Sequence, residues 1–142
     1  MNKFIEIIVR GLLIKDKHLL VCHNAENRFA YLPGGHVEFW ETREQALQRE
    51  WQEELDCNCR VGKFLRLFED RFTDDKGETF HEYAFLYQVS CEFLNLQNPL
   101  PHPEPDLFFE WIPLSKIDHH NILPLAMRDY IGTFTPEVYP SV

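Results

Sequence analysis

One segment in the middle of the chain has the period of a helix, and it lies between stretches that have the composition of strands. Thr42 followed by Gln45 fits a capping box, in which the side chain of each residue bonds the backbone N–H of the other at a helix start. Apolar side chains then recur at every fourth position: Leu47, Trp51 and Leu55. Because this spacing places them on one side of a helix, we predict a helix over 43–55 that packs on a core.

The segments on either side are rich in residues that favour strands. The expected strands lie at 3–14, 18–22, 60–72, 79–91 and 108–112. A short aromatic piece at 29–32 leads into Pro33-Gly34-Gly35, which we expect to break strand structure. A closing helix is expected over 123–131, with Pro124 in its first turn and Gly132 just past its end. Strands before, between and after helices predict a mixed-sheet domain of the α/β or α+β class.

Length and charge set further bounds. The 142 residues fit one domain over 1–142, and a hydrophobic content of 44% is enough to form a core. We expect the tail at 133–142 to be loosely held. The net charge of -9 argues against nucleic acid as a partner. There is no apolar run of about 20 residues to span a membrane, and Glu6 interrupts any signal-like segment, so we expect a cytoplasmic protein with no membrane partner.

The four cysteines do not have the spacing of a zinc site: Cys22, Cys57, Cys59 and Cys91. In a cytoplasmic protein we expect reduced and largely buried thiols. A redox pair is the alternative.

The chemistry is concentrated on the predicted helix. Glu50, Glu53 and Glu54 are spaced i, i+3 and i+4, so the three carboxylates leave one face within one turn. Taken alone they fit a solvated acidic face. Their surroundings favour a site instead, because a Pro-Gly-Gly turn and Glu41 precede the helix and Arg49 stands beside Glu50. A hard divalent cation such as Mg²⁺ would relieve the repulsion between the carboxylates.

A motif of 23 positions contains these residues: Gly35, five residues, Glu41, seven residues, then Arg49-Glu50-Trp51-Gln52-Glu53-Glu54-Leu55-Asp56-Cys57. It resembles the Nudix box of the Nudix (MutT-like) pyrophosphohydrolases. Three positions depart from the family pattern. Asp56 replaces a glycine at a place that often needs a left-handed backbone, Cys57 is small for an apolar position, and Trp40 replaces a glycine before Glu41.

The resemblance implies an α/β/α sandwich with a loop-helix-loop on a mixed sheet. It also implies Mg²⁺-dependent or Mn²⁺-dependent hydrolysis of a nucleoside diphosphate linked to another group, by attack of an activated water. The implied metal ligands are Glu50, Glu53, Glu54 and the carbonyl of Gly34. Arg49, Gly35 and Glu41 would support the loop and helix. For the general base we rank Glu53 first and the loop residue Glu104 second.

The substrate is less well indicated. A proline that follows the box in ADP-ribose hydrolases is absent, since Thr73 occupies its place. Tyr31, His36 and Arg71 are named as substrate contacts, whereas aromatic residues such as Phe29, Phe72 and Phe80 are more often core. The implied partner is a small nucleotide. A nucleotide sensor that does not hydrolyse its ligand and an isomerase of isoprenoid diphosphates are alternatives, and a homodimer is left open.

Overall fold

The computed structural model describes residues 3–26 and 28–134. In chain order, its elements are β1 (Lys3–Leu12), β2 (Ile14–Lys15), β3 (His18–His23), β4 (Ala30–Tyr31), β5 (Gly34–His36), α1 (Arg43–Leu55), β6 (Arg60–Thr73), β7 (Thr79–Ser90), β8 (Phe108–Pro113), the 3-10 helix η1 (Leu114–His119) and α2 (Leu125–Gly132). The bounds of α1 are those predicted from its capping box and apolar spacing.

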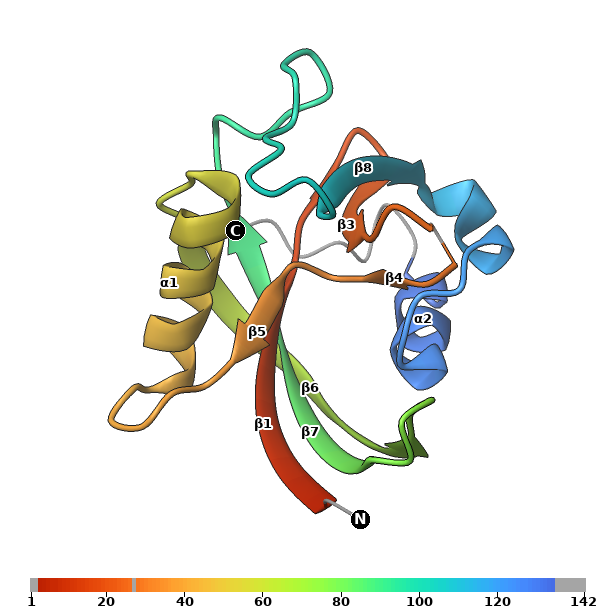
Figure 1. Ribbon diagram of the computed structural model, residues 1–142. Coiled ribbons are helices and arrows are strands. Elements are labelled where there is room, and N and C mark those ends of the chain that lie inside the picture. Colours follow the sequence, from red (N-terminus) through yellow and green to blue (C-terminus); the bar gives the residue numbers. More distant parts are fainter. Residues whose placement is uncertain (1–2, 27, 135–142) are drawn as a thin grey trace.

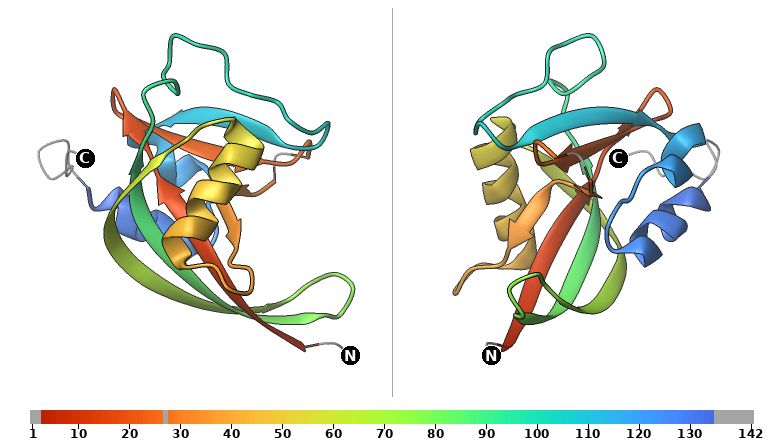
Figure 2. Two further views of the ribbon diagram at one scale, coloured as in Figure 1. Left: turned by 90° about the vertical axis from the view of Figure 1, so that its left-hand side faces the viewer. Right: turned by 45° about the vertical axis from the view of Figure 1, so that its right-hand side comes forward.

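Two sheets form the centre of the molecule. The first has the order β5-β1-β7-β6, in which β1 and β7 are parallel and the other neighbours are antiparallel. The second consists of β2, β3 and β4, with β8 paired to β3. Helix α1 lies on one side of the strands and α2 on the other (Figures 1 and 2). The mixed α/β (α+β) class and the α/β/α sandwich are thereby confirmed.

The core is divided by the first sheet. On β1, Ile8 and Val9 point to opposite faces because side chains alternate along a strand, and both are buried. Ile8 belongs to the hydrophobic cluster that contains Met127 of α2, and Val9 to the cluster that contains Trp51 of α1. The sequence of the central strand β1 therefore contains a nearly continuous apolar run rather than an alternation of apolar and polar residues.

The structure corrects the expectation that Pro33-Gly34-Gly35 breaks strand structure. Gly34 and Gly35 belong to β5, where Gly34 pairs with Arg10 and Gly35 with Val9. A Cβ at Gly34 would lie 1.9 Å from the carbonyl oxygen of Val9, so the backbones approach more closely than a side chain would permit. A three-residue strand that contains two glycines has no strand composition to reveal it.

The cysteines require a second correction. Cys57, just after α1, is joined to Cys91, just after β7, by a disulfide across 34 residues of sequence. Cys22 and Cys59 are free and buried, as expected, and burial raises the pKa of each thiol to about 11. The pair forms because the sheet brings the end of α1 beside the end of β7, which sequence spacing alone does not show.

Smaller differences lie near the C-terminus. Helix α2 has Pro124 as its N-cap and includes Gly132 in its last turn. The 3-10 helix η1 was not predicted. The tail expected to be loosely held lies largely outside the described residues, which end at Phe134.

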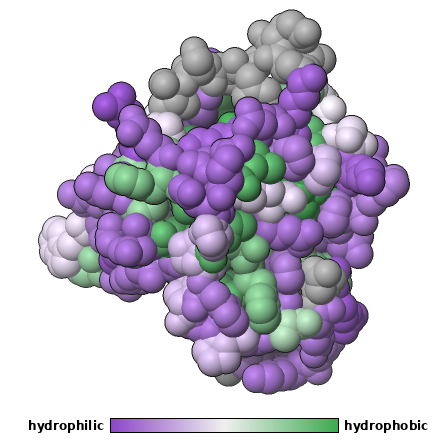
Figure 3. All heavy atoms as spheres, turned by 90° about the horizontal axis from the view of Figure 1, so that it is seen from above, coloured by the Kyte–Doolittle hydropathy of each residue, from purple (hydrophilic) through white to green (hydrophobic). Residues whose placement is uncertain are grey.

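The surface is largely polar. Seen from above, the molecule presents mainly hydrophilic side chains, with apolar ones showing between them (Figure 3). Among the described residues, no helix has the length and apolar character needed to cross a membrane.

Candidate active site

Helix α1 is fixed at both ends and along one face. Both hydrogen bonds of the predicted capping box form: the Gln45 N–H donates to the Thr42 hydroxyl (3.1 Å), and the Thr42 N–H donates to the Gln45 side chain (2.9 Å). The indole of buried Trp51 donates to the carbonyl of Pro33 at 3.1 Å, which ties the helix to the start of β5. Asp56 ends the helix with φ 49° and ψ 40°, the left-handed conformation expected at this position. The carboxylate-bearing face is therefore held rigidly against β5.

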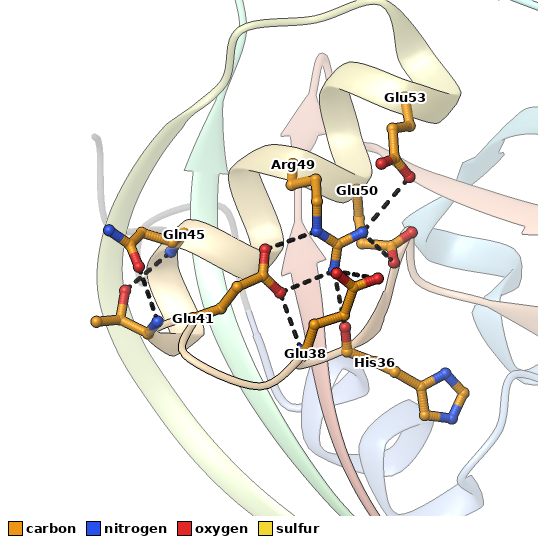
Figure 4. A network of polar contacts seen from close by, with 8 residues as sticks. His36, Glu38, Glu41, Gln45, Arg49, Glu50 and Glu53 are labelled. Atoms are coloured by element: carbon orange, nitrogen blue, oxygen red, sulfur yellow. Dashed lines mark hydrogen bonds and ion pairs between the residues drawn. The ribbon is translucent and has the colours of Figure 1, made fainter.

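Arg49 joins the loop before α1 to the helix (Figure 4). Its guanidinium donates to both carboxylate oxygens of Glu41, at 2.6 and 2.9 Å, and to the carbonyl of His36 at 3.0 Å. It also donates to Glu50 at 3.0 Å and to Glu53 at 3.4 Å. The structure thus brings together four of the residues singled out by the motif, and the planar fork of an arginine is suited to such a set of acceptors.

These contacts shift the pKa values of Glu41 and Arg49 in opposite directions. Hydrogen bonding to Arg49 holds the pKa of Glu41 below its usual range, and the backbone N–H of Glu38 adds to this effect. The same bond from Glu41 raises the pKa of Arg49. The loop is thus closed on the helix by a charge-assisted bidentate contact.

Glu50 and Glu54 form the inner part of the site. The Glu50 side chain lies against the backbone of Gly35, where a Cβ would come within 2.5 Å of its carboxylate. Burial, the charge of Glu50 and a hydrogen bond between the two carboxyls together raise the pKa of Glu54 to about 7. This is the pattern of two carboxylates that share a partly dry space, in which the contact of Glu50 with Arg49 does not remove the repulsion at Glu54.

Glu53 lies at the outer edge, with 59% of its side chain exposed. Within the described part of the chain, no three His, Cys, Asp or Glu side chains are already grouped to hold a metal ion. The donor set nevertheless fits a hard divalent cation, because the carboxyl oxygens of Glu50 and Glu54 lie side by side and the contact between Arg49 and Glu50 neutralises only one of the two. Gly34 is buried in β5, next to the Gly35 that Glu50 contacts.

Two charged residues outside α1 reach this group. The charge of Glu104 raises the pKa of Glu54 and that of Arg10 lowers it, so both lie near the carboxylates. Sequence reasoning named Glu104 and did not select Arg10 as a site residue. The signal for Arg10 was its position as the charged residue inside the apolar run Ile7–Leu13.

The three residues named as substrate contacts lie in different places. The ring of Tyr31 lies beneath Arg10, with 5.4 Å between the guanidinium carbon and the ring centroid. The imidazole of His36 contacts Glu6 at 2.6 Å and is 63% exposed. Arg71 alternates with Asp70 and Phe72 on β6, so it points to the opposite face of the sheet.

Tyr31 belongs to the wall of a cavity of about 390 Å³ on the α2 side of the sheet. Aromatic and charged side chains line much of this cavity: Arg10, Phe29, Tyr31, Asp70, Phe72 and Glu82. The expectation that Phe29 and Phe72 belong to the core is wrong, since they are 40% and 41% exposed. Phe80 instead stacks between Phe4 and Phe72.

An α/β/α sandwich whose loop-helix carries paired carboxylates near an aromatic cavity defines a class of domains with a candidate metal site. Comparison with known families identifies which one. The model of the NUDIX domain matches residues 6–134, and the chain belongs to the Nudix family.

Individual relatives agree with this assignment. The ADP-ribose pyrophosphatase of Methanocaldococcus jannaschii is 30% identical over 127 residues, which cover 86% of this chain and 73% of the relative. The MutT protein of Methanosarcina mazei Go1 has a TM-score of 0.65 and 21% identity, covering 92% of this chain and 93% of that one. The dihydroneopterin triphosphate pyrophosphohydrolase of E. coli has a TM-score of 0.63 and 18% identity, with the same coverage. The chain is a Nudix pyrophosphohydrolase, as the motif predicted.

Proposed function

We propose that the protein hydrolyses a phosphoanhydride bond in a small nucleotide, namely a nucleoside diphosphate linked to another group, such as a nucleoside triphosphate or a nucleotide sugar. Mg²⁺ is the expected cofactor, with Mn²⁺ as a substitute. The observation that carries the proposal is the pair of half-buried, mutually hydrogen-bonded carboxyls of Glu50 and Glu54 beside Arg10. Two adjacent carboxyls favour the binding of a divalent cation, and a bound cation allows an acidic site to accept a diphosphate.

Each residue of the motif then has a role. Glu50, Glu53 and Glu54, with the carbonyl of Gly34, would hold the metal. A bound divalent cation supplies neutralisation of the diphosphate and a water of lowered pKa. Arg49 and Glu41 keep the loop and helix in register, and Gly35 leaves room for the Glu50 carboxylate.

The general base is proposed to be Glu53. It is the most exposed of the three helix carboxylates that we assign to the metal, and its 3.4 Å contact with Arg49 is long for a charge-assisted bond. Its carboxylate is thus accessible to a water and able to accept a proton. Glu104, whose charge is felt at Glu54, is the second candidate for this role.

The proposal is tested by product analysis with ³¹P NMR across a panel of nucleotides with Mg²⁺ or Mn²⁺. ADP-ribose belongs in the panel because of the archaeal relative, although Thr73 stands where the ADP-ribose hydrolases have a proline. We expect the variants Glu53→Gln and Glu54→Gln to lose about 100-fold or more in kcat, since each removes a charge at the reacting centre. Glu44→Gln is the matched control, because Glu44 lies on the same helix and bonds Tyr87 instead.

Unchanged turnover in both variants would contradict the assignment of these ligands. Nucleotide binding without any metal-dependent product would favour a sensor, and a product that keeps its diphosphate intact would favour an isomerase. The homodimer remains a prediction, which light scattering of the purified protein measures directly.

A further inference from the structure

The cavity beside the carboxylates has walls of two kinds. Phe29, Tyr31 and Phe72 present partly exposed rings, and aromatic rings at the rim of a cavity of this size are suited to hold a flat ligand ring. Between them the sheet contributes charged groups: Arg10 from β1, Glu82 from β7 and Asp70 from β6. The cavity is therefore neither a purely apolar slot nor a purely ionic one.

The charges are arranged along the strands. Arg10 is paired with Leu86, whereas Glu82 is paired with Glu6, four residues earlier on both strands. This separation corresponds to about 13 Å along the sheet. The charge of Arg10 acts on both Glu54 and Glu82, so Arg10 lies between the candidate metal site and the acidic end of the cavity. A nucleotide whose phosphates lie at the Arg10 end would extend its base toward Glu82 and Asp70.

Among the described residues, Glu82 is the acid in this row that has no hydrogen-bond or ion-pair partner. Glu6 contacts His36, and one oxygen of Asp70 accepts from the backbone N–H of Arg71 at 2.9 Å. Among the residues that the structure describes, the half-buried carboxylate of Glu82 forms no hydrogen bond or ion pair with another residue. Burial raises the pKa of Glu82; the charge of Arg10, and to a smaller extent that of His36, lowers it, and the charges of Glu6 and Asp70 raise it.

The pairing of Glu82 with Asp70 is unfavourable in the free protein, and the charge of Arg10 offsets part of its cost. Asp70 and Glu82 stand directly opposite each other on antiparallel strands, and like charges in that position repel. A ligand with N–H donors would relieve the repulsion and satisfy the open carboxylate. A carboxylate accepts best from two adjacent N–H groups, as it does from the fork of an arginine.

We propose that Glu82, supported by Asp70, selects a base that presents two adjacent N–H donors at its edge, the amide N–H and exocyclic amino group that guanine and pterins share. The inference rests on the proposed function, because it places the phosphates at the Arg10 end. Adenine offers a ring acceptor beside its amino group, and uracil flanks its N–H with carbonyls, so both present a lone pair to the carboxylate. Glu82 is thus a specificity-determining residue rather than a catalytic one.

The test compares GTP with ITP, which differ only in the 2-amino group. We expect kcat/KM for GTP to exceed that for ITP by about 10-fold to 100-fold, as for a hydrogen bond to a charged group. In Glu82→Gln the ratio falls toward one, mainly through KM, and Asp70→Asn reduces it less. Glu69→Gln is the matched control, since Glu69 neighbours Asp70 on the opposite face and contacts His81. Dihydroneopterin triphosphate forms a third arm that distinguishes a pterin site from a guanine site.

Two further readouts separate the possible failures. Calorimetric binding of GDP and IDP measures the preference without hydrolysis, so a protein that cleaves no nucleotide would refute the proposed function while the base selection is still decided. Thermal denaturation should show Glu82→Gln to be at least as stable as the wild type, because it removes a cross-strand repulsion. Equal treatment of GTP and ITP, or of GDP and IDP, overturns the inference, and so does an unchanged ratio in Glu82→Gln.

Discussion

Arg49 shows how much of the site depends on a single side chain. It has acceptors on the loop (Glu41 and the carbonyl of His36) and on the helix (Glu50 and Glu53). A lysine would supply the charge but not the fixed directions of five N–H groups. Residue identity, and not charge alone, therefore sets the position of the Glu50 carboxylate.

The contact between Arg49 and Glu41 predicts a dependence of stability on pH. The pKa of Glu41 is lower in the folded protein than its unfolded value of about 4.3. The contact therefore stabilises the fold above that pH, and the stabilisation is lost as the pH falls through the folded-state pKa. We expect Glu41→Gln to lower the free energy of unfolding at pH 7 by about 1 kcal/mol, a value that allows for screening by solvent.

Denaturant unfolding of the wild type and of Glu41→Gln at pH 7 and pH 3 measures this difference. The gap between the two proteins should shrink at the lower pH. A gap that stays constant over this range would mean that the carboxylate charge contributes nothing to stability. Glu38→Gln is the control, since Glu38 is 67% exposed and 3.9 Å from the same guanidinium.

At the scale of elements, the end of α1 explains a departure from the family motif. Asp56 adopts φ 49°, a conformation that glycine reaches at little cost and that other residues reach at some expense. The Asp56 side chain accepts a hydrogen bond from Gln52 at 3.0 Å, which offsets part of that expense. The helix thus ends at the same place without glycine.

Restoring the glycine should therefore change stability and not catalysis. We expect Asp56→Gly to stabilise the protein by up to about 1 kcal/mol, reduced by the loss of the Gln52 contact. Chemical denaturation measures the change, and kcat for the preferred nucleotide should stay within about twofold because the carboxylates proposed to hold the metal precede this residue. Asp56→Ala has neither the conformational freedom of glycine nor the hydrogen bond to Gln52, so it should destabilise the protein. Greater stability in Asp56→Ala than in the wild type would contradict this account.

At the scale of the whole molecule, the disulfide joins the chain just after α1 to the chain just after the central strand β7. Cys57 and Cys91 enclose a loop that contains β6 and β7. Closing a loop of 34 residues removes conformational freedom from the unfolded chain. The bond therefore contributes to stability through the unfolded state as well as through the native contacts.

Removing this bond should lower the free energy of unfolding by about 2 to 4 kcal/mol. Denaturation with and without reductant measures the change, and the double variant Cys57→Ala/Cys91→Ala should reproduce the reduced protein. The free thiols provide the control, because Cys22→Ala alters a buried cysteine without touching the bond. Equal midpoints for oxidised and reduced protein would show that the bond adds nothing.

Sequence reasoning succeeded where short-range physics decides the outcome. The bounds of α1, the capping box and the left-handed end at Asp56 depend on residues a few positions apart, and so does the grouping of Glu50, Glu53 and Glu54. It failed at β5, where strand pairing with β1 overrides the local preference of two glycines. It also left open which aromatic residues face solvent, since Phe29 and Phe72 line a wall that several elements form together.

The sequence by itself therefore determined the family, the helix and the carboxylates that the helix presents, because these follow from spacing along one element. Only the tertiary structure decided the disulfide partner of Cys57, the place of Arg10 between Glu54 and Tyr31, and the open carboxylate of Glu82 in the cavity. Each of these depends on residues that are distant in sequence and are brought together by the pairing of β1 with β7 and of β7 with β6. The tertiary structure likewise divides the acidic residues into separate groups. One group of carboxylates is suited to bind a cation, and another is suited to accept hydrogen bonds from the N–H groups of a nucleotide base.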